Sequence, residues 1–309
     1  MLHQIALENM YLNDRQLVSD IYQMRRLSST RQLVRAQEEQ LMEQVDSIVL
    51  YGGIRYDVDE AQMAAQSNLY PQQRAYRDVN ETDIDRGSVS FLPGTLEEVT
   101  RIDTLLSDSR QAHTVLKDLE ANEESFKALS GTNTALLHVA THGFFWKKES
   151  AMLATYTSGG VSEQQVLRQM DPLRRCGLLL AGANTALSGH AADLPQGVQD
   201  GVLTGQEIAL LDLNKTRIAI LSACKTGVGE VTGDGVFGLQ RAFKKAGVET
   251  LIMSLWKVND AATQQLMTEF YYNWITLHQS KREAFRNAQN AVRAVHAEPT
   301  YWAGFIMLD

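Results

Sequence analysis

The sequence predicts an α/β fold, a three-layer sandwich in which a mostly parallel central sheet has helices on both faces. From about residue 92 onward, apolar strand-like runs alternate with segments of helical spacing. The strongest runs, 135–141, 217–223 and 249–256, are almost continuously apolar, as strands buried on both faces are. The chain of 309 residues is 44% hydrophobic and 21% charged, which is the composition of a globular protein with a substantial core.

The first part of the chain alternates less regularly. We expect two short strands at 2–8 and 21–27, a helix at 30–45, and a strand at 47–51 closed by Gly52 and Gly53. The stretch from about 57 to 88 is polar and poor in large aliphatic residues, which predicts a long loop. The expected organisation is therefore an N-terminal part at 1–56, a loop at 57–89 and a core at 90–309.

Strands and helices alternate clearly in this expected core. Pro93 begins a helix with Glu97 and Glu98 in its first turn, where acids stabilise the helix dipole. Thr204 is a predicted helix N-cap, and Gly247 follows the end of another helix. Hydrophobic periodicity predicts strands at 112–116, 135–141, 177–181, 217–223, 249–256 and 301–308, and helices at 122–129, 205–210, 236–246, 260–277 and 280–296.

Charge and cysteine content exclude several classes of function. The net charge of −8 argues against nucleic acid as the main partner, because phosphate binding needs a basic surface. The two cysteines, Cys176 and Cys224, make neither a disulfide framework nor a zinc cluster, so no metal or other cofactor is expected. We find no membrane-length apolar run and no signal peptide, and expect a cytoplasmic protein with reduced thiols.

Two reactive side chains follow two of the strongest strands. The run from Leu136 ends at His142 and Gly143, and the run from Ile218 ends at Cys224. If the two runs are neighbouring parallel strands, the imidazole and the thiol lie side by side at the carboxyl edge of the sheet, where α/β proteins bind ligands. A basic residue and a turn after Cys224 favour the thiolate. The sequence therefore predicts a cysteine hydrolase with His142 as general base.

Structural interpretations of the same residues remain open. A lone cysteine at the end of a buried strand is usually a small hydrophobic residue. His138 lies inside an apolar run and is expected to be a buried, hydrogen-bonded core histidine. It lies on the same strand face as His142, but no third ligand supports a metal site. The order of histidine before cysteine, without a G-x-C-x-G elbow, disfavours an α/β-hydrolase, an amidotransferase or a papain-like site.

A glycine-rich loop at 227–235 follows the Cys224 strand. It lies between a strand and a helix, as a phosphate-binding loop does, but it lacks the G-x-x-x-x-G-K-[ST] pattern. Its acids, Glu230 and Asp234, would repel phosphate. A loop that shapes a substrate pocket is therefore better supported than a nucleotide site.

A series of stretches in fixed order points to one family. They cover roughly 90–309, with a weaker likeness in 1–35, and are Leu92–Thr95, Leu137–Phe145, Gly177–Asn184, Leu221–Gly227, Gly235–Leu239, Ser254–Val258 and Tyr301–Ala303. Together they resemble the CHAT domain, a caspase-related cysteine peptidase family usually associated with tetratricopeptide repeats. The resemblance implies a caspase-like sandwich whose start is truncated here, because the family usually has another strand and helices before Leu2.

The resemblance also implies a catalytic dyad. Cys224 attacks the scissile carbonyl, while His142 acts first as general base and then as acid toward the leaving amine. The backbone N–H groups of Gly143 and Cys224 form the implied oxyanion hole.

Substrate binding is implied at another strand end. The segment that resembles the peptide-pairing strand of caspases is Ser254, Leu255 and Trp256. We expect the first specificity pocket between this strand, the Cys224 strand and the glycine-rich loop. An acid there selects a basic residue before the cleaved bond, and the candidates are Asp234, Asp260 and Glu230.

The sequence thus predicts a cysteine endopeptidase that cleaves a protein substrate. The resemblance implies an effector controlled by a partner protein or by an upstream tetratricopeptide-repeat region, for example in bacterial defence. The alternative is a catalytically silent module that uses the same cleft to bind peptides.

Overall fold

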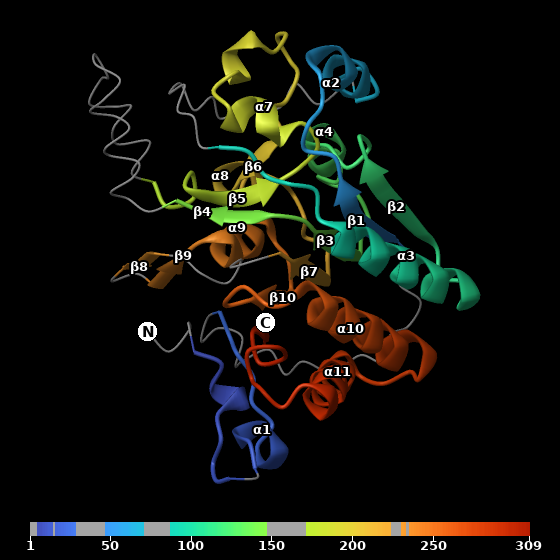
Figure 1. Cartoon of the computed structure of the whole chain (residues 1–309), viewed down its shortest axis with the longest axis vertical. Coiled ribbons are helices and arrows are strands. Elements are labelled where there is room, and N and C mark those ends of the chain that lie inside the picture. The colour runs from blue at the N-terminus through green and yellow to red at the C-terminus, as the bar shows by residue number, and fades with distance from the viewer. Residues whose placement is uncertain are drawn as a thin grey trace.

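A six-stranded sheet in the order β11-β10-β7-β3-β1-β2 organises the chain (Figure 1). The computed structural model describes residues 5–14, 16–28, 47–70, 87–146, 171–223, 230–232 and 235–309. The strands are β1 (Ile48–Ile54), β2 (His113–Asp118), β3 (Leu136–Ala140), β7 (Ile218–Ser222), β10 (Thr250–Ser254) and β11 (Phe305–Leu308). All neighbouring pairs are parallel except β10 and β11. The predicted mostly parallel sheet is confirmed.

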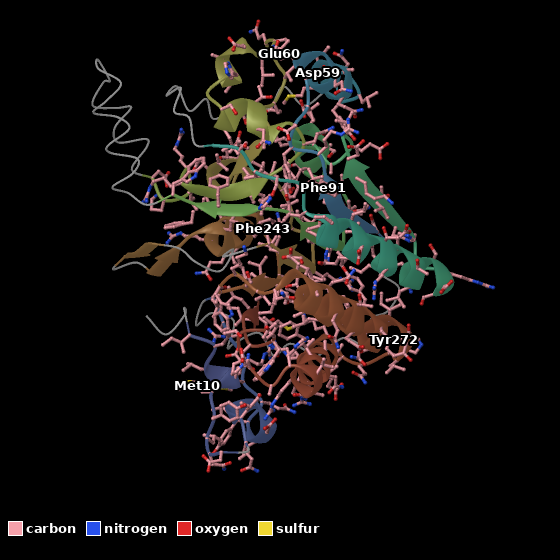
Figure 2. All side chains as sticks on the ribbon, in the orientation of Figure 1. Met10, Asp59, Glu60, Phe91, Phe243 and Tyr272 are labelled. Carbon is pink, nitrogen blue, oxygen red and sulfur yellow. The ribbon has the colours of Figure 1, made fainter. Side chains whose placement is uncertain are left out.

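Helices cover both faces of this sheet. One layer contains α3 (Pro93–Asp108), α10 (Asp260–Tyr271) and α11 (Lys281–Val295), and the other contains α4 (Glu123–Lys127), α8 (Gly205–Ile208) and α9 (Leu239–Ala246). Successive strand residues point to opposite faces, so β1 contributes Ile48 to one core and Val49 to the other. Figure 2 shows Phe243 of α9 inside its layer, and Tyr272 at the outer surface beyond α10. The three-layer sandwich is confirmed.

Two smaller sheets lie outside the central one. β4 (Gly143–Phe145), β5 (Cys176–Leu179) and β6 (Val202–Thr204) form an antiparallel sheet, and β8 (Glu230–Thr232) pairs with β9 (Gly235–Phe237). The run predicted as a strand at 177–181 therefore belongs to a separate sheet. Gly177 permits this packing, because a Cβ there would lie 2.5 Å from Cζ of Phe144.

Strand β1 continues through the two glycines that were expected to close it. The helix α3 packs directly on Gly52, where a Cβ would lie 2.7 Å from the carbonyl oxygen of Thr95. Gly53 has a φ of 59°, which favours glycine, and its N–H donates to Thr95 Oγ1 at 3.1 Å. The β1–β2 register shifts between Tyr51 and Ile54. The glycines thus mark an irregularity inside the strand and not its end.

The predicted N-terminal strands are wrong where the structure describes them. The chain forms a 3₁₀ turn at Leu7–Asn9 and a short helix α1 at Val18–Ile21, and pairs with β11 only through an isolated bridge from Arg26. An ion pair between Arg26 and Glu8, at 2.7 Å, holds the segments around these two residues side by side without the hydrogen-bond ladder of paired strands. The helix expected at 30–45 lies outside the described residues.

The expected loop at 57–88 contains a helix, α2 (Glu60–Ser67). Asp59 begins it, because its side chain accepts a hydrogen bond from the N–H of Gln62 at 2.8 Å. Residues 71–86 lie outside the described part, and 87–92 lead into α3 at Pro93.

The remaining elements follow the sequence with shifted ends. Thr204 caps α8 together with Glu207, and Gly247 ends α9 with a φ of 107°. Helix α9 begins later than predicted because β9 takes residues 235–237. A short helix, α7 (Ala183–Leu187), follows β5, and a π-helical turn at Tyr272–Thr276 follows α10. Within the described ranges, every helix is too short or too polar to cross a membrane.

Candidate active site

The strands that lead to His142 and Cys224 are neighbours in the sheet. β3 and β7 run parallel in a register that pairs Ala140 with Ser222, and the N–H of Thr141 donates to the carbonyl oxygen of Ser222 at 3.3 Å. The predicted adjacency of the two strand ends is confirmed. Cys224 itself lies outside the described residues, so its position stays a prediction.

His142 is held in one orientation by a backbone carbonyl. Its Nε2 lies 2.9 Å from the carbonyl oxygen of Ser90, and its ring lies against that of Tyr56 with centroids 5.1 Å apart. A carbonyl oxygen only accepts hydrogen bonds, so Nε2 carries the hydrogen and Nδ1 of the neutral ring carries the free lone pair. The half-buried imidazole is thus set up to accept a proton at Nδ1.

Tyr56 ties this histidine to the neighbouring strands. Its hydroxyl lies 2.9 Å from Thr141 Oγ1, which in turn donates to the carbonyl oxygen of Leu179. Because the Thr141 hydrogen is used there, Tyr56 is the donor to Thr141. Burial raises the pKa of Tyr56 to about 12, so the phenol stays protonated and keeps this role at neutral pH. The residue before His142 is therefore fixed from both sides.

The backbone N–H of Gly143 faces away from β5. In an antiparallel pair, hydrogen-bonded positions alternate with non-hydrogen-bonded ones. His142 accepts a hydrogen bond from the N–H of Leu179 at 2.9 Å, and Gly143 is paired with Leu178 one position further. Gly143 therefore occupies a non-hydrogen-bonded position. Its N–H points away from β5, on the open side of the outer strand β4.

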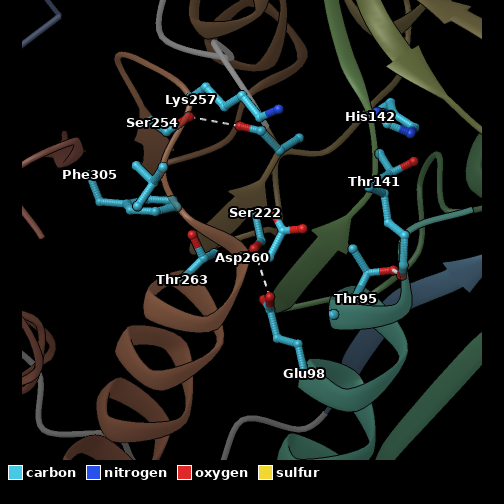
Figure 3. A pocket seen from close by; sticks show the side chains of 14 residues that line it. Thr95, Glu98, Thr141, His142, Ser222, Ser254, Lys257, Asp260, Thr263 and Phe305 are labelled. Atoms are coloured by element: carbon cyan, nitrogen blue, oxygen red, sulfur yellow. Dashed lines mark hydrogen bonds between the residues drawn. The ribbon is translucent and has the colours of Figure 1, made fainter. Parts of the chain in front are cut away.

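A pocket of about 210 Å³ opens between these strand ends and the starts of α3 and α10 (Figure 3). Its lining comes from β7, β10 and β11, from the residues that follow β3, β7 and β10, and from the two helices. It includes Leu92, Glu98, His142, Ala223, Asp260 and Phe305. This pocket lies at the carboxyl edge of the parallel strands, the position that the fold predicts for a ligand site.

Glu98 contributes a buried carboxylate to this pocket. It is 2% exposed, accepts a hydrogen bond from the hydroxyl of Ser222 at 3.0 Å, and lies 2.8 Å from Nε2 of His138. The other nitrogen of His138 lies 3.3 Å from the hydroxyl of Tyr271. The prediction that His138 is a buried, hydrogen-bonded core histidine is confirmed. The prediction that Glu97 and Glu98 lie in the first turn of their helix is wrong: α3 begins at Pro93 and its first turn contains no acid, so Glu98 lies one turn further in.

The predicted substrate residues divide into two groups. Ser254 and Asp260 line the pocket, and the hydroxyl of Ser254 donates to the carbonyl oxygen of Ala223 at 2.7 Å. Leu255 and Trp256 do not line it: Leu255 is buried in the core and its N–H donates to Gly304. Trp256 donates through Nε1 to the carbonyl oxygen of Thr300 at 3.2 Å. Both follow the end of β10 and are hydrogen-bonded to the turn before β11.

The other candidates lie elsewhere or outside the described structure. Asp234 and the side chain of Glu230 are outside the described part of the chain. Cys176 is buried in β5, where burial raises the pKa of its thiol to about 12. Among the described residues, no group of His, Cys, Asp and Glu side chains is arranged to hold a metal ion.

The described residues define a three-layer α/β protein with a histidine-lined pocket at the carboxyl edge of its central sheet. Residues 1–309 match the family described as the CHAT domain, and the chain belongs to that family.

Similar proteins include large proteins named for tetratricopeptide repeats. Tetratricopeptide repeat protein 28 of Mus musculus is 26% identical over 245 residues, and that of Homo sapiens is 26% identical over 228 residues. The alignments cover 73% of this chain but 9% of each relative, so the chain corresponds to a small part of their length.

Two solved structures of a cysteine proteinase are also similar. The Arg-specific cysteine proteinase gingipain R is 9% identical, with a TM-score of 0.45 over 80% of this chain and 50% of that chain. A complex of the pro- and mature domains from Porphyromonas gingivalis is 11% identical, with a TM-score of 0.42 over 80% and 51% of the two chains.

Proposed function

We propose that this CHAT domain is a cysteine endopeptidase in which Cys224 is the nucleophile and His142 the general base. The observation that supports it best is the orientation of His142. Its Nε2 is held by Ser90, which leaves Nδ1 as the basic atom beside a pocket lined by Ala223, the residue directly before Cys224. The β3–β7 register pairs Ala140 with Ser222, so the strands that lead to His142 and to Cys224 end side by side.

The chemistry follows from these groups. Nδ1 of His142 takes the thiol proton of Cys224, and the thiolate adds to the scissile carbonyl carbon. The N–H of Gly143, which faces out of its sheet, and the N–H of Cys224 stabilise the resulting oxyanion. His142 then gives its proton to the leaving amine as the C–N bond breaks, and water hydrolyses the thioester to release the acid and restore the thiol.

The pocket beside His142 binds the side chain that precedes the cleaved bond. Its walls include Leu92 and Phe305, and it contains the carboxylates of Glu98 and Asp260. In Figure 3 the Lys257 ammonium lies on the opposite side of the view from the Glu98 carboxylate. The apolar walls and the acids in this pocket match the aliphatic stem and cationic head of lysine or arginine. Peptide backbone pairs near Ser254, at the end of β10, as the family resemblance implies.

Asp260→Asn tests this specificity. We expect kcat/KM for peptides with arginine or lysine before the cleaved bond to fall about tenfold, the size of one charge-assisted interaction. Peptides with leucine at that position should be cleaved at an unchanged rate. The matched control is Asp108→Asn, which makes the same charge change at the exposed end of α3. An equal loss on basic and leucine substrates would show that Asp260 does not select the residue.

The regulation that we propose is based on the similarity to proteins whose names refer to tetratricopeptide repeats. Proteins named for tetratricopeptide repeats contain a similar segment as a small part of their length. We therefore place the domain behind such a repeat region or under the control of a partner protein, as an effector peptidase, for example in bacterial defence. The second candidate function is a silent peptide-binding module, which would use the same pocket without cleavage.

Selective alkylation separates the two functions. We expect iodoacetamide to modify Cys224 much faster than Cys176, because Cys176 is buried and its pKa of about 12 leaves about one thiol in ten thousand ionised at pH 8. His142→Ala should slow the modification of Cys224, since the imidazole no longer takes the thiol proton. Peptide mass analysis of the labelled chain measures both rates. A Cys224 no more reactive than Cys176 would favour the silent module.

A further inference from the structure

A second cavity, of about 370 Å³, lies between the N-terminal segment and the helix α11. Its volume is within the range of about 300–1,000 Å³ that is common for ligand pockets. The floor includes the apolar side chains of Phe285 from α11 and Met307 from β11. None of the site residues discussed above lines it.

Four arginines line this cavity. Arg25 and Arg26 come from the N-terminal segment, and Arg282 and Arg286 lie one turn apart on the same face of α11. The clustering contrasts with the net charge of the whole chain, which is −8. Like charges at this spacing repel one another, so the cluster is stabilised only where anions pair with it.

Three of the four guanidinium groups hold carboxylates of the chain itself. Arg26 pairs with Glu8 at 2.7 Å, and Arg25 pairs with the buried side chain of Asp309 at 3.1 Å. Arg282 also forms an ion pair with Asp309. The arginines of this cavity thus already bind carboxylates, for which the planar guanidinium offers several donors.

Arg286 differs from these three. It is half-buried, and within the described residues its guanidinium makes neither a hydrogen bond nor an ion pair within 4.0 Å. The nearest acid in sequence, Glu283, also lines the cavity, but it is exposed and accepts a hydrogen bond from the hydroxyl of Ser280 at 2.9 Å, and its charge interacts with that of Arg286 without a direct ion pair. Charged groups that leave water usually gain a partner, so Arg286 is the position where an added carboxylate would be stabilised most.

We propose that this cavity binds an acidic peptide segment of a partner protein, with a carboxylate of the segment on Arg286 and an adjacent apolar side chain over Phe285 and Met307. The carboxylates already bound to the other arginines favour this ligand over phosphate. The apolar floor favours a peptide with alternating acidic and apolar side chains over a free anion.

The cavity shares strand β11 with the candidate active site. Met307 lines the cavity and Phe305, two residues before it, lines the pocket beside His142. Gln289 lines the cavity too, and its side-chain amide donates to the carbonyl oxygen of Phe305 at 3.1 Å. A bound segment would therefore contact Met307 and Gln289, which are connected to the Phe305 wall of the substrate pocket through the β11 backbone and this hydrogen bond. This consequence rests on the proposed function, whereas the binding itself does not.

Fluorescence anisotropy with the whole chain tests the proposal. The probe is an acetylated, fluorescein-labelled peptide of alternating glutamate and leucine, compared with the same peptide containing glutamine. We expect the glutamate peptide to bind at least about tenfold tighter, and Arg286→Gln to weaken it about tenfold. The matched control Arg101→Gln removes the same charge from the exposed face of α3 and should leave binding unchanged. Arg286→Lys should bind between the two, and rising salt should weaken binding.

Several results would overturn the proposal. They are equal binding of the glutamate and glutamine peptides, equal losses in Arg286→Gln and Arg101→Gln, or binding of inorganic phosphate without binding of the peptide. Thermal melting of both variants confirms that they are folded before comparison. If Arg286→Gln does not fold, protection of Arg286 from phenylglyoxal by the glutamate peptide in the unaltered chain decides the question. None of these measurements needs peptidase activity, so they succeed or fail independently of the proposed function.

Discussion

Replacing His142 by alanine is expected to lower kcat/KM for peptide hydrolysis by about 10²–10⁴-fold, the range for loss of a general acid–base catalyst. The ring of His142 is held through Nε2 by Ser90, so alanine removes the basic Nδ1 together with this hydrogen bond and the ring contact with Tyr56. Cys224→Ala should abolish turnover altogether, because no nucleophile remains. The two losses should not add in the double variant, since both residues serve the same step.

The substrate for this measurement comes from unbiased profiling of the unaltered chain beside Cys224→Ala, with and without an upstream repeat region. The matched control is His190→Ala, an exposed histidine that forms an ion pair with Asp193 at 3.0 Å. It should keep full activity. Cleavage of the same substrate by Cys224→Ala at the unaltered rate would rule out the dyad.

Hydrophobic pattern alone predicted the inner strands of the central sheet, because these strands are buried on both faces, whereas the edge strand β2 is partly exposed. The runs at β3, β7 and β10 have no solvent-facing side, so their apolar character is continuous and their boundaries are clear. The same reasoning placed His142 at a strand end, since it is the first polar residue after the buried stretch that leads into Gly143. What pattern could not decide was the sheet to which a short apolar run belongs: the strand predicted at 177–181 forms as β5, but in the small antiparallel sheet.

The sequence did not indicate the roles of Ser90 and Glu98, which hold His142 and His138, respectively. Ser90 acts through its backbone carbonyl and lies 52 residues before His142, so its side chain says nothing about the role. Glu98 looks like any acid in the first turns of a helix. Its burial depends on α3 lying across β3 and β7, where it meets Ser222 and His138. Such contacts follow from the packing of distant elements and not from local composition.

In the N-terminal segment, local pattern predicted strands that the described residues do not form. Short apolar stretches at 2–8 and 21–27 suggested strands, but local pattern is ambiguous over so few residues. Ion pairs of Arg25 and Arg26 with Asp309 and Glu8 fix this segment instead. The partners are 284 and 18 residues away in the chain, respectively, which no window of sequence could connect.

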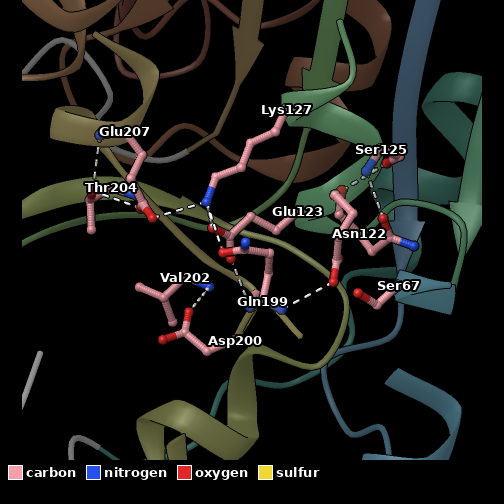
Figure 4. A network of polar contacts seen from close by, with 12 residues as sticks. Ser67, Asn122, Glu123, Ser125, Lys127, Gln199, Asp200, Val202, Thr204 and Glu207 are labelled. Carbon is pink, nitrogen blue, oxygen red and sulfur yellow. Dashed lines mark hydrogen bonds and ion pairs between the residues drawn. The ribbon is translucent and has the colours of Figure 1, made fainter. Parts of the chain in front are cut away.

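Lys127→Met is expected to destabilise the protein by about 3–5 kcal/mol, the cost of breaking a buried ion pair by removing one partner. Lys127 is 2% exposed and lies 2.6 Å from a carboxylate oxygen of Glu123 and 3.0 Å from one of Glu207 (Figure 4). It also donates to the side chain of Gln199 at 2.8 Å. Methionine fills the same space but leaves two carboxylates buried without their cation, so the loss is electrostatic and not a cavity effect.

The network joins elements far apart in the chain. Glu123 of α4 accepts a hydrogen bond from the N–H of Gly201 at 3.0 Å, and Glu207 is the residue that caps α8 through Thr204. Removing the ammonium therefore weakens the contacts of α4 with α8 and with the segment at 199–201. Chemical denaturation measures the change, with Lys215→Met as the control, because Lys215 is exposed and should alter stability by less than about 0.5 kcal/mol.

The pH dependence of the same network has a definite sign. Burial opposes the charged ammonium, but the carboxylates of Glu123 and Glu207 outweigh it and raise the pKa of Lys127 above its usual value. A cation with a raised pKa in the folded state stabilises the fold fully below its unfolded pKa, and the contribution is lost only as the pH rises through the folded pKa. The contribution of the ammonium to the gap between Lys127→Met and the unaltered chain should therefore be present at neutral pH and shrink in strong alkali. Burial raises the pKa of the Glu123 carboxyl, so the gap should also shrink as the pH falls and this carboxyl takes up a proton. An equal denaturation midpoint for both at neutral pH would mean that the buried ammonium contributes nothing to stability.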